Sequence, residues 1–261
     1  MREIFKRYSI MGACALGSLL APLAPAAENA VFDFEAAGFP VPSLFNQPHA
    51  WKGREGETEL RAVERPGGSS TAAVLSESRG MTLSPRSDSA LNGELASLTV
   101  SLAFRMDKAV PTPVFLQRIQ SSSSNPGYFS FHSQNNHGNA EERRGTLRFV
   151  ITDSQGAHTA ASKQNWNGAA GEWHCAAIVF DGGTVRFYLD GAPLGEPVTM
   201  QATSIPAVSP DGKAVFRSGF GFPGAVDDLV ILPNRVLDDE QIKLLHESGL
   251  ASGEVLEILK P

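Results

Sequence analysis

Cysteine is almost absent from this 261-residue sequence, which contains only Cys14 and Cys175. Because Cys14 lies within a predicted N-terminal leader, the remaining chain has a single cysteine and cannot form an internal disulfide. The G-x-S-x-G pattern of serine hydrolases is also missing, and Cys175 has no positioned base, since the side chain of His174 should point to the opposite face of a strand. The sequence therefore offers no nucleophile for covalent catalysis, and its stability must come from a hydrophobic core.

Positive charge and long hydrophobic runs are scarce as well. The chain has 22 Lys and Arg against 28 Asp and Glu, which gives a net charge of -6. Such an acidic balance excludes nucleic acid and anionic membranes as expected partners. The apolar stretch at residues 10–23 is interrupted by Gly12, Gly17 and Pro22 and is shorter than the roughly 20 residues that a membrane span needs.

The first residues have the order of a secretory signal peptide. Arg2, Lys6 and Arg7 precede an uncharged stretch, which ends in the small-residue pattern Ala24-Pro25-Ala26. We predict cleavage after Ala26 and export to the periplasm, the cell envelope or the medium. A lipid anchor on Cys14 is disfavoured because residues 10–13 fit a lipid-attachment box poorly.

The rest of the chain indicates one all-β domain. Removing residues 1–26 takes away three basic side chains and one acidic one, so the net charge changes from -6 to -8. About 235 residues remain, enough for a single large β domain, which we place at residues 27–250 with a C-terminal tail at 251–261. Apolar residues alternate with polar ones at 98–106, 146–151 and 184–189, which is typical of strands with one buried face.

Turn signals punctuate these strands. Asp181-Gly182-Gly183 and Asp190-Gly191 flank the last strand, and an Asp-Gly pair favours a two-residue hairpin because both central residues need positive φ. We therefore expect strands that pair with their sequence neighbours in an antiparallel sandwich. One short helix is predicted, with Asp238 and Gln241 as a capping box and Gly249 as its end.

Two segments carry a resemblance to a known family. Residues 171–195 place Trp173-His174 at the start of one strand and Tyr188-Leu189-Asp190-Gly191 at the end of the next, and residues 224–249 contain Gly224, Val226, Asp227-Asp228 and Asn234-Arg235-Val236-Leu237. These motifs, with an opening strand at residues 30–35, resemble laminin-G-like jellyroll domains of the concanavalin A-like lectin and glucanase superfamily. The resemblance implies an antiparallel jellyroll β-sandwich.

The resemblance also implies a structural calcium ion. In this superfamily, an aspartate that opens the last strand often binds calcium together with backbone carbonyls, and Asp227 occupies the matching position. Ca²⁺ takes six to eight oxygen ligands, and Asp33 is the expected second carboxylate, with Glu35 as a weaker alternative. If no ion is bound, Asp227 and Asp228 are solvated residues of an edge strand.

Glycoside hydrolysis, which the glucanase branch performs, is not expected here. That branch carries an E-x-D-x-E on one strand, so that all three carboxylates share a face. This sequence has no such motif, and Glu141-Glu142 lies in a charged loop. Only a carboxylate pair assembled from distant strands would make the chain an enzyme.

Sugar binding is the remaining interpretation of the sequence. Proteins hold sugars with an aromatic ring together with amide or carboxylate groups. Tyr128 and Asn135 in one segment, Trp166 beside two asparagines, and Trp51 have this composition, although each can also be ordinary core or turn material. We therefore predict a secreted, non-catalytic module that binds carbohydrate or a glycan-bearing surface. The alternatives are a protein-binding or structural cell-envelope module and, third, an enzyme with a non-standard carboxylate pair.

Overall fold

The computed structural model describes most of the chain after the predicted leader. The described residues are 28–36, 39–45, 50–53, 58–65, 68–76, 80–108, 110–120, 122–134, 145–166, 170–209, 214–221 and 223–261. The predicted signal peptide, residues 1–26, lies outside them, as does Asn135.

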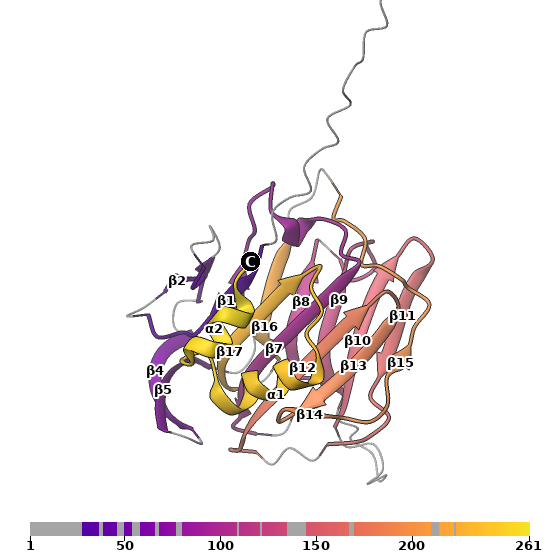
Figure 1. Ribbon diagram of the computed structural model, residues 1–261. Coiled ribbons are helices and arrows are strands. Elements are labelled where there is room, and N and C mark those ends of the chain that lie inside the picture. The colour runs from indigo at the N-terminus through magenta and orange to yellow at the C-terminus, as the bar shows by residue number, and fades with distance from the viewer. Residues whose placement is uncertain are drawn as a thin grey trace, which may run out of the picture.

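Two antiparallel sheets make up the body of the molecule (Figure 1). The larger sheet has the order β14-β13-β12-β7-β17-β5-β4, with β1 beside β17 and β15 beside β13. Its strands are β1 (Ala30–Phe32), β4 (Thr58–Arg65), β5 (Gly68–Leu75), β7 (Ser97–Met106), β12 (Trp173–Asp181), β13 (Thr184–Leu189), β14 (Ala192–Pro193), β15 (Val198–Thr199) and β17 (Gly224–Pro233).

The smaller sheet lies behind the larger one and has the order β11-β10-β9-β8-β16-β6. Its strands are β6 (Met81–Leu83), β8 (Val114–Ile119), β9 (Phe129–Gln134), β10 (Thr146–Asp153), β11 (Gly156–Ala161) and β16 (Val215–Phe220). A separate pair is formed by β2 (Val41–Pro42) and β3 (Ala50–Trp51), and a short 3-10 helix spans Ala90–Asn92.

The core fills the space between the two sheets. In β7, Leu98, Val100, Leu102 and Phe104 are fully buried on one face, and Leu147, Phe149 and Ile151 of β10 are fully buried on the facing sheet. The period-two pattern therefore marks the inner face of each strand, as expected of a sandwich. The prediction of an antiparallel β-sandwich is confirmed.

Strand pairing differs in part from the expectation that neighbours in sequence pair with one another. The hairpin of β12 and β13 forms as predicted, with its turn at Gly182-Gly183, and Asp190-Gly191, with φ values of 50° and 77°, forms the next turn, between β13 and β14. β7, however, pairs with β12 and β17, which lie far from it along the chain. This crossover is what makes the fold a jellyroll rather than a meander of hairpins.

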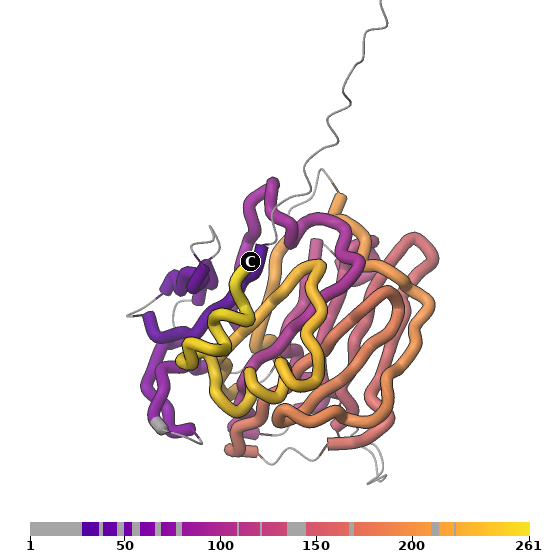
Figure 2. The backbone as a smooth tube through the Cα atoms, in the orientation of Figure 1, coloured from indigo at the N-terminus to yellow at the C-terminus, as the bar shows by residue number. Residues whose placement is uncertain are grey.

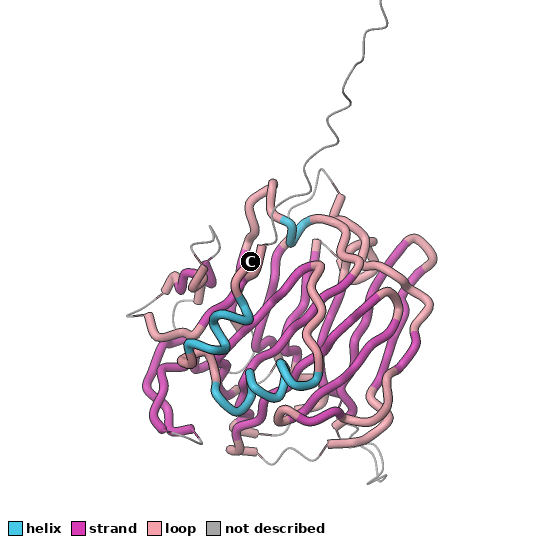
Figure 3. Tube along the Cα trace, viewed as in Figure 1, coloured by secondary structure: helices cyan, strands magenta, loops and turns pink. Residues whose placement is uncertain are grey.

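The two α-helices cover the outer face of the larger sheet, whereas the 3-10 helix lies at one end of the sandwich (Figure 3). Helix α1 (Asp239–Ser248) begins at the predicted capping box, and its end at Gly249 is confirmed. A second helix, α2 (Gly253–Leu259), buries Val255 and Leu259 against the same face. Residues 251–261 are therefore packed onto the domain rather than forming a separate tail.

The two ends of the described chain meet. The side-chain amide of Asn29 donates to the carbonyl oxygen of Leu259 at 2.7 Å, and Figure 2 shows the C-terminus beside the indigo opening strand. Neither helix in the described residues is long and apolar enough to cross a membrane.

Candidate functional site

Asp227 and Asp228 lie at a bulge in β17. Successive residues of a strand normally point to opposite faces, but the register of β17 against β7 shifts between Asp227 and Val230, and Asp228 has a φ of 47°. The bulge turns both carboxylates toward the outer face of the larger sheet. Both accept a hydrogen bond from the Arg65 guanidinium at the end of β4, at 2.5 Å from Asp227 Oδ2 and 2.9 Å from Asp228 Oδ2.

Further hydrogen bonds fix this cluster of Arg65, Asp227 and Asp228. The Ser70 hydroxyl donates to Asp227 Oδ2 at 2.8 Å, and the backbone N–H of Asp228 donates to Asp227 Oδ1 at 2.9 Å. Asp228 also accepts from the backbone N–H of Leu250, just beyond α1. The cluster thus ties the β4–β5 hairpin, β17 and the end of α1 together.

Burial decides the electrostatics of the cluster. Asp227 has an exposed fraction of 0%, and burial, followed by the charge of Asp228, raises its pKa to about 7. Burial also raises the pKa of Asp228. Burial lowers the pKa of Arg65, but the negative charges of Asp228 and Asp227 raise it by more. The net effect is a pKa of Arg65 above its ordinary value. The arginine therefore stays charged and supplies the counter-charge for the two carboxyls.

These residues do not fit the implied calcium ion. Asp33, the expected second carboxylate beside Asp227, lies near Asp228 and lines the same pocket. The guanidinium of Arg65, however, lies 2.5 Å from Asp227 Oδ2 and takes the place beside this carboxylate where a cation would bind. The alternative that Asp227 and Asp228 are solvated residues of an edge strand is wrong, because β17 lies between β7 and β5 and Asp227 is buried.

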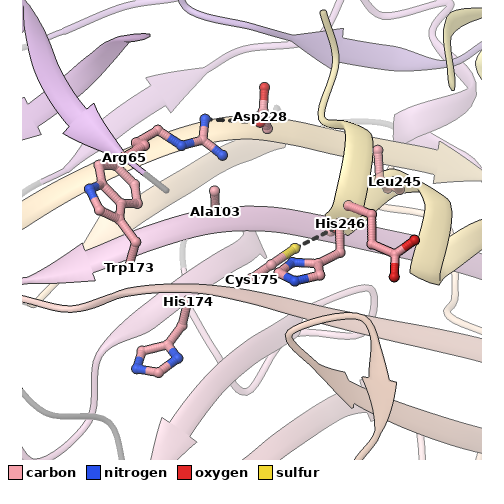
Figure 4. A pocket seen from close by; sticks show the side chains of 10 residues that line it. Arg65, Ala103, Trp173, His174, Cys175, Asp228, Leu245 and His246 are labelled. Carbon is pink, nitrogen blue, oxygen red and sulfur yellow. Dashed lines mark hydrogen bonds and ion pairs between the residues drawn. The ribbon is translucent and has the colours of Figure 1, made fainter. Parts of the chain in front are cut away.

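A pocket of about 310 Å³ adjoins the cluster on the same face. Its lining includes the small residues Ser101, Ala103 and Cys175, which leave a hollow between the β4–β5 hairpin and α1. Figure 4 shows Arg65 and Trp173 on one side of this pocket, and Asp228 and His246 on its other sides. A second pocket of about 360 Å³ shares Arg65, Asp228 and His246 with the first and adds Asp33 and Glu35.

Trp173 is held in a fixed orientation at this pocket. It is half-buried, and its indole N–H donates to the carbonyl oxygen of Glu64 at 2.9 Å. The guanidinium groups of Arg65 and Arg105 lie 5.2 and 5.7 Å from its ring centroid, within the range of cation–π contacts.

The neighbours of Trp173 in β12 are structural. His174 packs its ring against Phe104 and Trp166, and its Nδ1 lies 2.9 Å from Asp190 Oδ2. Burial raises the pKa of the Cys175 thiol to about 12, which leaves it protonated at neutral pH.

Two of the predicted sugar-binding residues are core residues instead. Trp51 has an exposed fraction of 0% and packs against Phe32, and Trp166 is 3% exposed, with its indole N–H bonded to the Ser133 hydroxyl at 3.1 Å. Their rings are not available to a ligand, so these two predictions are wrong. Tyr128 is half-buried just before β9, and Asn135 falls outside the described residues.

Sequence reasoning missed Arg65 and the role of Trp173. Arg65 lies 162 residues from Asp227 in a region without a recognisable motif, so no local signal could connect them. Trp173 enters the sequence analysis only as part of the motif that resembles the family. Its alternation with Cys175 and Ala177, whose side chains share the outer face, could have shown that it points away from the core.

Comparisons with known proteins agree with this architecture. The Laminin_G_3 model, described as the concanavalin A-like lectin/glucanases superfamily, matches residues 76–243. The comparison with curated proteins found no match.

Solved structures share the fold at low identity. Domain 4 of AbnA, a GH43 extracellular arabinanase from Geobacillus stearothermophilus in complex with arabinotriose, is 19% identical, with a TM-score of 0.57 over 84% of this chain and 98% of that domain. The binding domain of botulinum neurotoxin DC in complex with SialylT is 13% identical, with a TM-score of 0.58 over 84% of this chain and 50% of that chain. The family match spans well over half of the sequence, and the chain therefore belongs to the concanavalin A-like lectin/glucanase superfamily.

Proposed function

We propose that this protein is a secreted, non-catalytic module that binds carbohydrate in the pocket beside Trp173. The position of that indole carries the proposal, because the other two tryptophans, Trp51 and Trp166, are buried in the core. Sugars are commonly bound by an aromatic ring together with charged or amide groups. Trp173 supplies the ring, and Asp228 and His246 lie within the same pocket.

The fold neighbours support a carbohydrate ligand. The arabinanase domain was solved with arabinotriose and the neurotoxin domain with SialylT. Both are similar to this chain only in fold, so their ligands serve as first probes.

The carboxylates around the pocket favour binding without hydrolysis. Glycosidases need two carboxyl groups roughly 5–10 Å apart and free to act on the scissile bond. Asp227 and Asp228 are both bonded to Arg65, and Glu35 accepts hydrogen bonds from the Ser70 hydroxyl and the Thr71 N–H. Each of these carboxylates already serves the structure, and the remaining carboxylate of the pocket, Glu247, pairs with Lys243 on the exposed side of α1 at 3.6 Å.

The test compares two aromatic variants of the exported protein. Calorimetry with arabinotriose, SialylT and a panel of neutral oligosaccharides should find a ligand, and Trp173→Ala should weaken its binding about tenfold or more. Tyr128 lies just before β9, a strand of the smaller sheet, whereas Trp173 opens β12 in the larger one. Tyr128→Ala should therefore leave the affinity unchanged.

Three results would contradict the proposal. Loss of binding in Tyr128→Ala but not in Trp173→Ala would move the site to the other predicted segment. Release of shorter sugars during the titration would show an enzyme. An N-terminus other than Ala27 on the exported protein, read by mass spectrometry, would overturn the assigned leader.

A further inference from the structure

The outer face of the smaller sheet bears a second group of polar side chains. Alternate residues of β10, Leu147 and Phe149, are fully buried in the core, so Arg148 between them points outward. By the same alternation, the outer face carries the following residues on β16, β8, β9 and β10: Arg217, Phe220, Gln117, Ser130, His132 and Arg148. Gln117 and Ser130 are buried beneath the other four, which are half-buried. We call these six residues the outer patch.

Strand register makes the outer patch continuous. Arg217 lies opposite Gln117, which lies opposite Ser130, and these three form one row across the sheet. Phe220, Val114, His132 and Arg148 form the adjacent row. Four neighbouring strands span about 14 Å, so long side chains from the two rows can contact one extended ligand.

The charge of the outer patch contrasts with that of the whole chain. Within the described residues, none of the outward-facing positions on this sheet is a carboxylate, and Arg148 and Arg217 form no ion pair. Elsewhere, Arg65, Arg86 and Arg186 each pair with an aspartate. In a protein of net charge -6, two unpaired arginines on one face form a local site for negative charge.

Arg148 also has a donor without an acceptor. Its Nε atom is buried and has no hydrogen-bond partner among the described residues. Buried donors in native proteins nearly always have a partner, whether protein, water or ligand. A surface ligand does not reach this buried atom, but the Arg148 guanidinium forms no ion pair in the described part of the chain, so a ligand with anionic oxygens would supply its counter-charge.

The remaining residues of the outer patch suit a sugar. The Arg217 guanidinium lies 5.6 Å from the ring centroid of the half-buried Phe220, which pairs an aromatic surface with a charged donor. His132 Nδ1 lies 3.1 Å from the Ser130 hydroxyl, and burial, followed by the charge of Arg148, lowers the pKa of His132 to about 4. His132 is therefore neutral at physiological pH and available for hydrogen bonds to hydroxyl groups.

We propose that the outer patch binds an acidic glycan, with Arg148 and Arg217 contacting its carboxylate or sulfate groups and His132 its hydroxyls. This inference rests on the proposed carbohydrate-binding function and names a ligand class for a surface separate from the Trp173 pocket. An acidic peptide would satisfy the arginines as well, but the aromatic ring beside Arg217 favours a sugar.

The experiment uses calorimetry with four probes of similar length: an oligogalacturonate, a sulfated oligosaccharide, a neutral malto-oligosaccharide and an oligoglutamate peptide. One or both acidic oligosaccharides should bind at low salt, more weakly as salt rises, and the neutral one should not bind the patch. Arg148→Gln and Arg217→Gln should each weaken this binding about tenfold, as loss of a charge-assisted hydrogen bond predicts.

Two further variants serve as controls, and thermal unfolding verifies that each variant is folded. Arg61→Gln removes an exposed arginine of β4 and should change nothing. Trp173→Ala should leave acidic-glycan binding intact even if it abolishes binding in the pocket, which separates the two proposals. Equal binding of neutral and acidic sugars, unchanged affinity in both arginine variants, or tighter binding of the peptide would each overturn the inference.

Discussion

Asp227 and Asp228 are consecutive residues whose carboxylates both face Arg65, and this arrangement depends on one backbone angle. With the usual alternation, Asp228 would point into the core between the sheets, where a carboxylate is costly to bury. Its φ of 47° and the bulge in β17 turn it outward instead. One guanidinium, that of Arg65, then pairs with both acidic groups, at the place where the implied calcium ion would bind.

Stability should therefore depend on Arg65 and not on calcium. We expect the thermal midpoint of residues 27–261 to be the same with calcium and with chelator, because a ligand stabilises only if it binds the folded state. Arg65→Ala should lower the free energy of unfolding by about 3–5 kcal/mol, since it leaves buried carboxyls without a counter-charge. Arg61→Ala, on the same strand but exposed, should cost less than about 0.5 kcal/mol.

A rise in the wild-type midpoint with calcium would contradict this assignment. So would equal midpoints for the Arg65→Ala and Arg61→Ala variants.

Helix α1 shows how an element places pocket residues. Its last turn carries His246 beside the pocket, while its first turn is attached to β13 by Asp239, which accepts hydrogen bonds from Arg186 Nη1 and the Tyr188 hydroxyl, each at 2.7 Å. The capping box at Asp238 and Gln241 fixes the start of the helix. Sequence predicted this helix because its signals are local, whereas α2 has no side-chain cap at Ser252 and was missed.

Removal of the cap should have a measurable but moderate cost. Asp238→Ala loses the bond from the Gln241 N–H at 2.8 Å, and we expect a loss of about 1 kcal/mol in unfolding free energy, measured by urea denaturation. Glu240 is an exposed acidic residue in the first turn, and Glu240→Ala should lower the unfolding free energy by only a few tenths of a kcal/mol. Equal losses in the two variants would show that helix-terminus charge, not the cap, stabilises α1.

Arg118 connects loops that belong to different parts of the molecule. It has an exposed fraction of 0%, and its guanidinium donates to the carbonyl oxygens of Leu91, Gly93, Gly127 and Pro206. Burial lowers its pKa to about 9, so it remains charged at neutral pH. These carbonyl groups lie in connecting segments that precede strands of both sheets. The Arg118 side chain therefore connects the two sheets at one end of the sandwich.

Arg118→Met should therefore destabilise the whole fold. It keeps an apolar chain of similar length but leaves several carbonyl oxygens without a donor, and we expect a loss of at least about 3 kcal/mol in urea unfolding. Arg217→Met, an outward-facing arginine on the neighbouring strand β16, should change stability by about 0.5 kcal/mol. Similar losses in both variants would argue against a special role for the Arg118 bonds.

The sequence by itself determined the strands at 98–106, 146–151 and 184–189, the Asp190-Gly191 turn and the limits of α1, because alternation, positive φ and capping act within a few residues. It did not determine that β7 would lie between β12 and β17, nor that Trp51 and Trp166 would be core residues while Trp173 lines a pocket. Whether a side chain is buried, paired or open depends on what lies across the sheet from it. For Arg65 and Asp227 that partner is 162 residues away, so only the tertiary structure could bring them together.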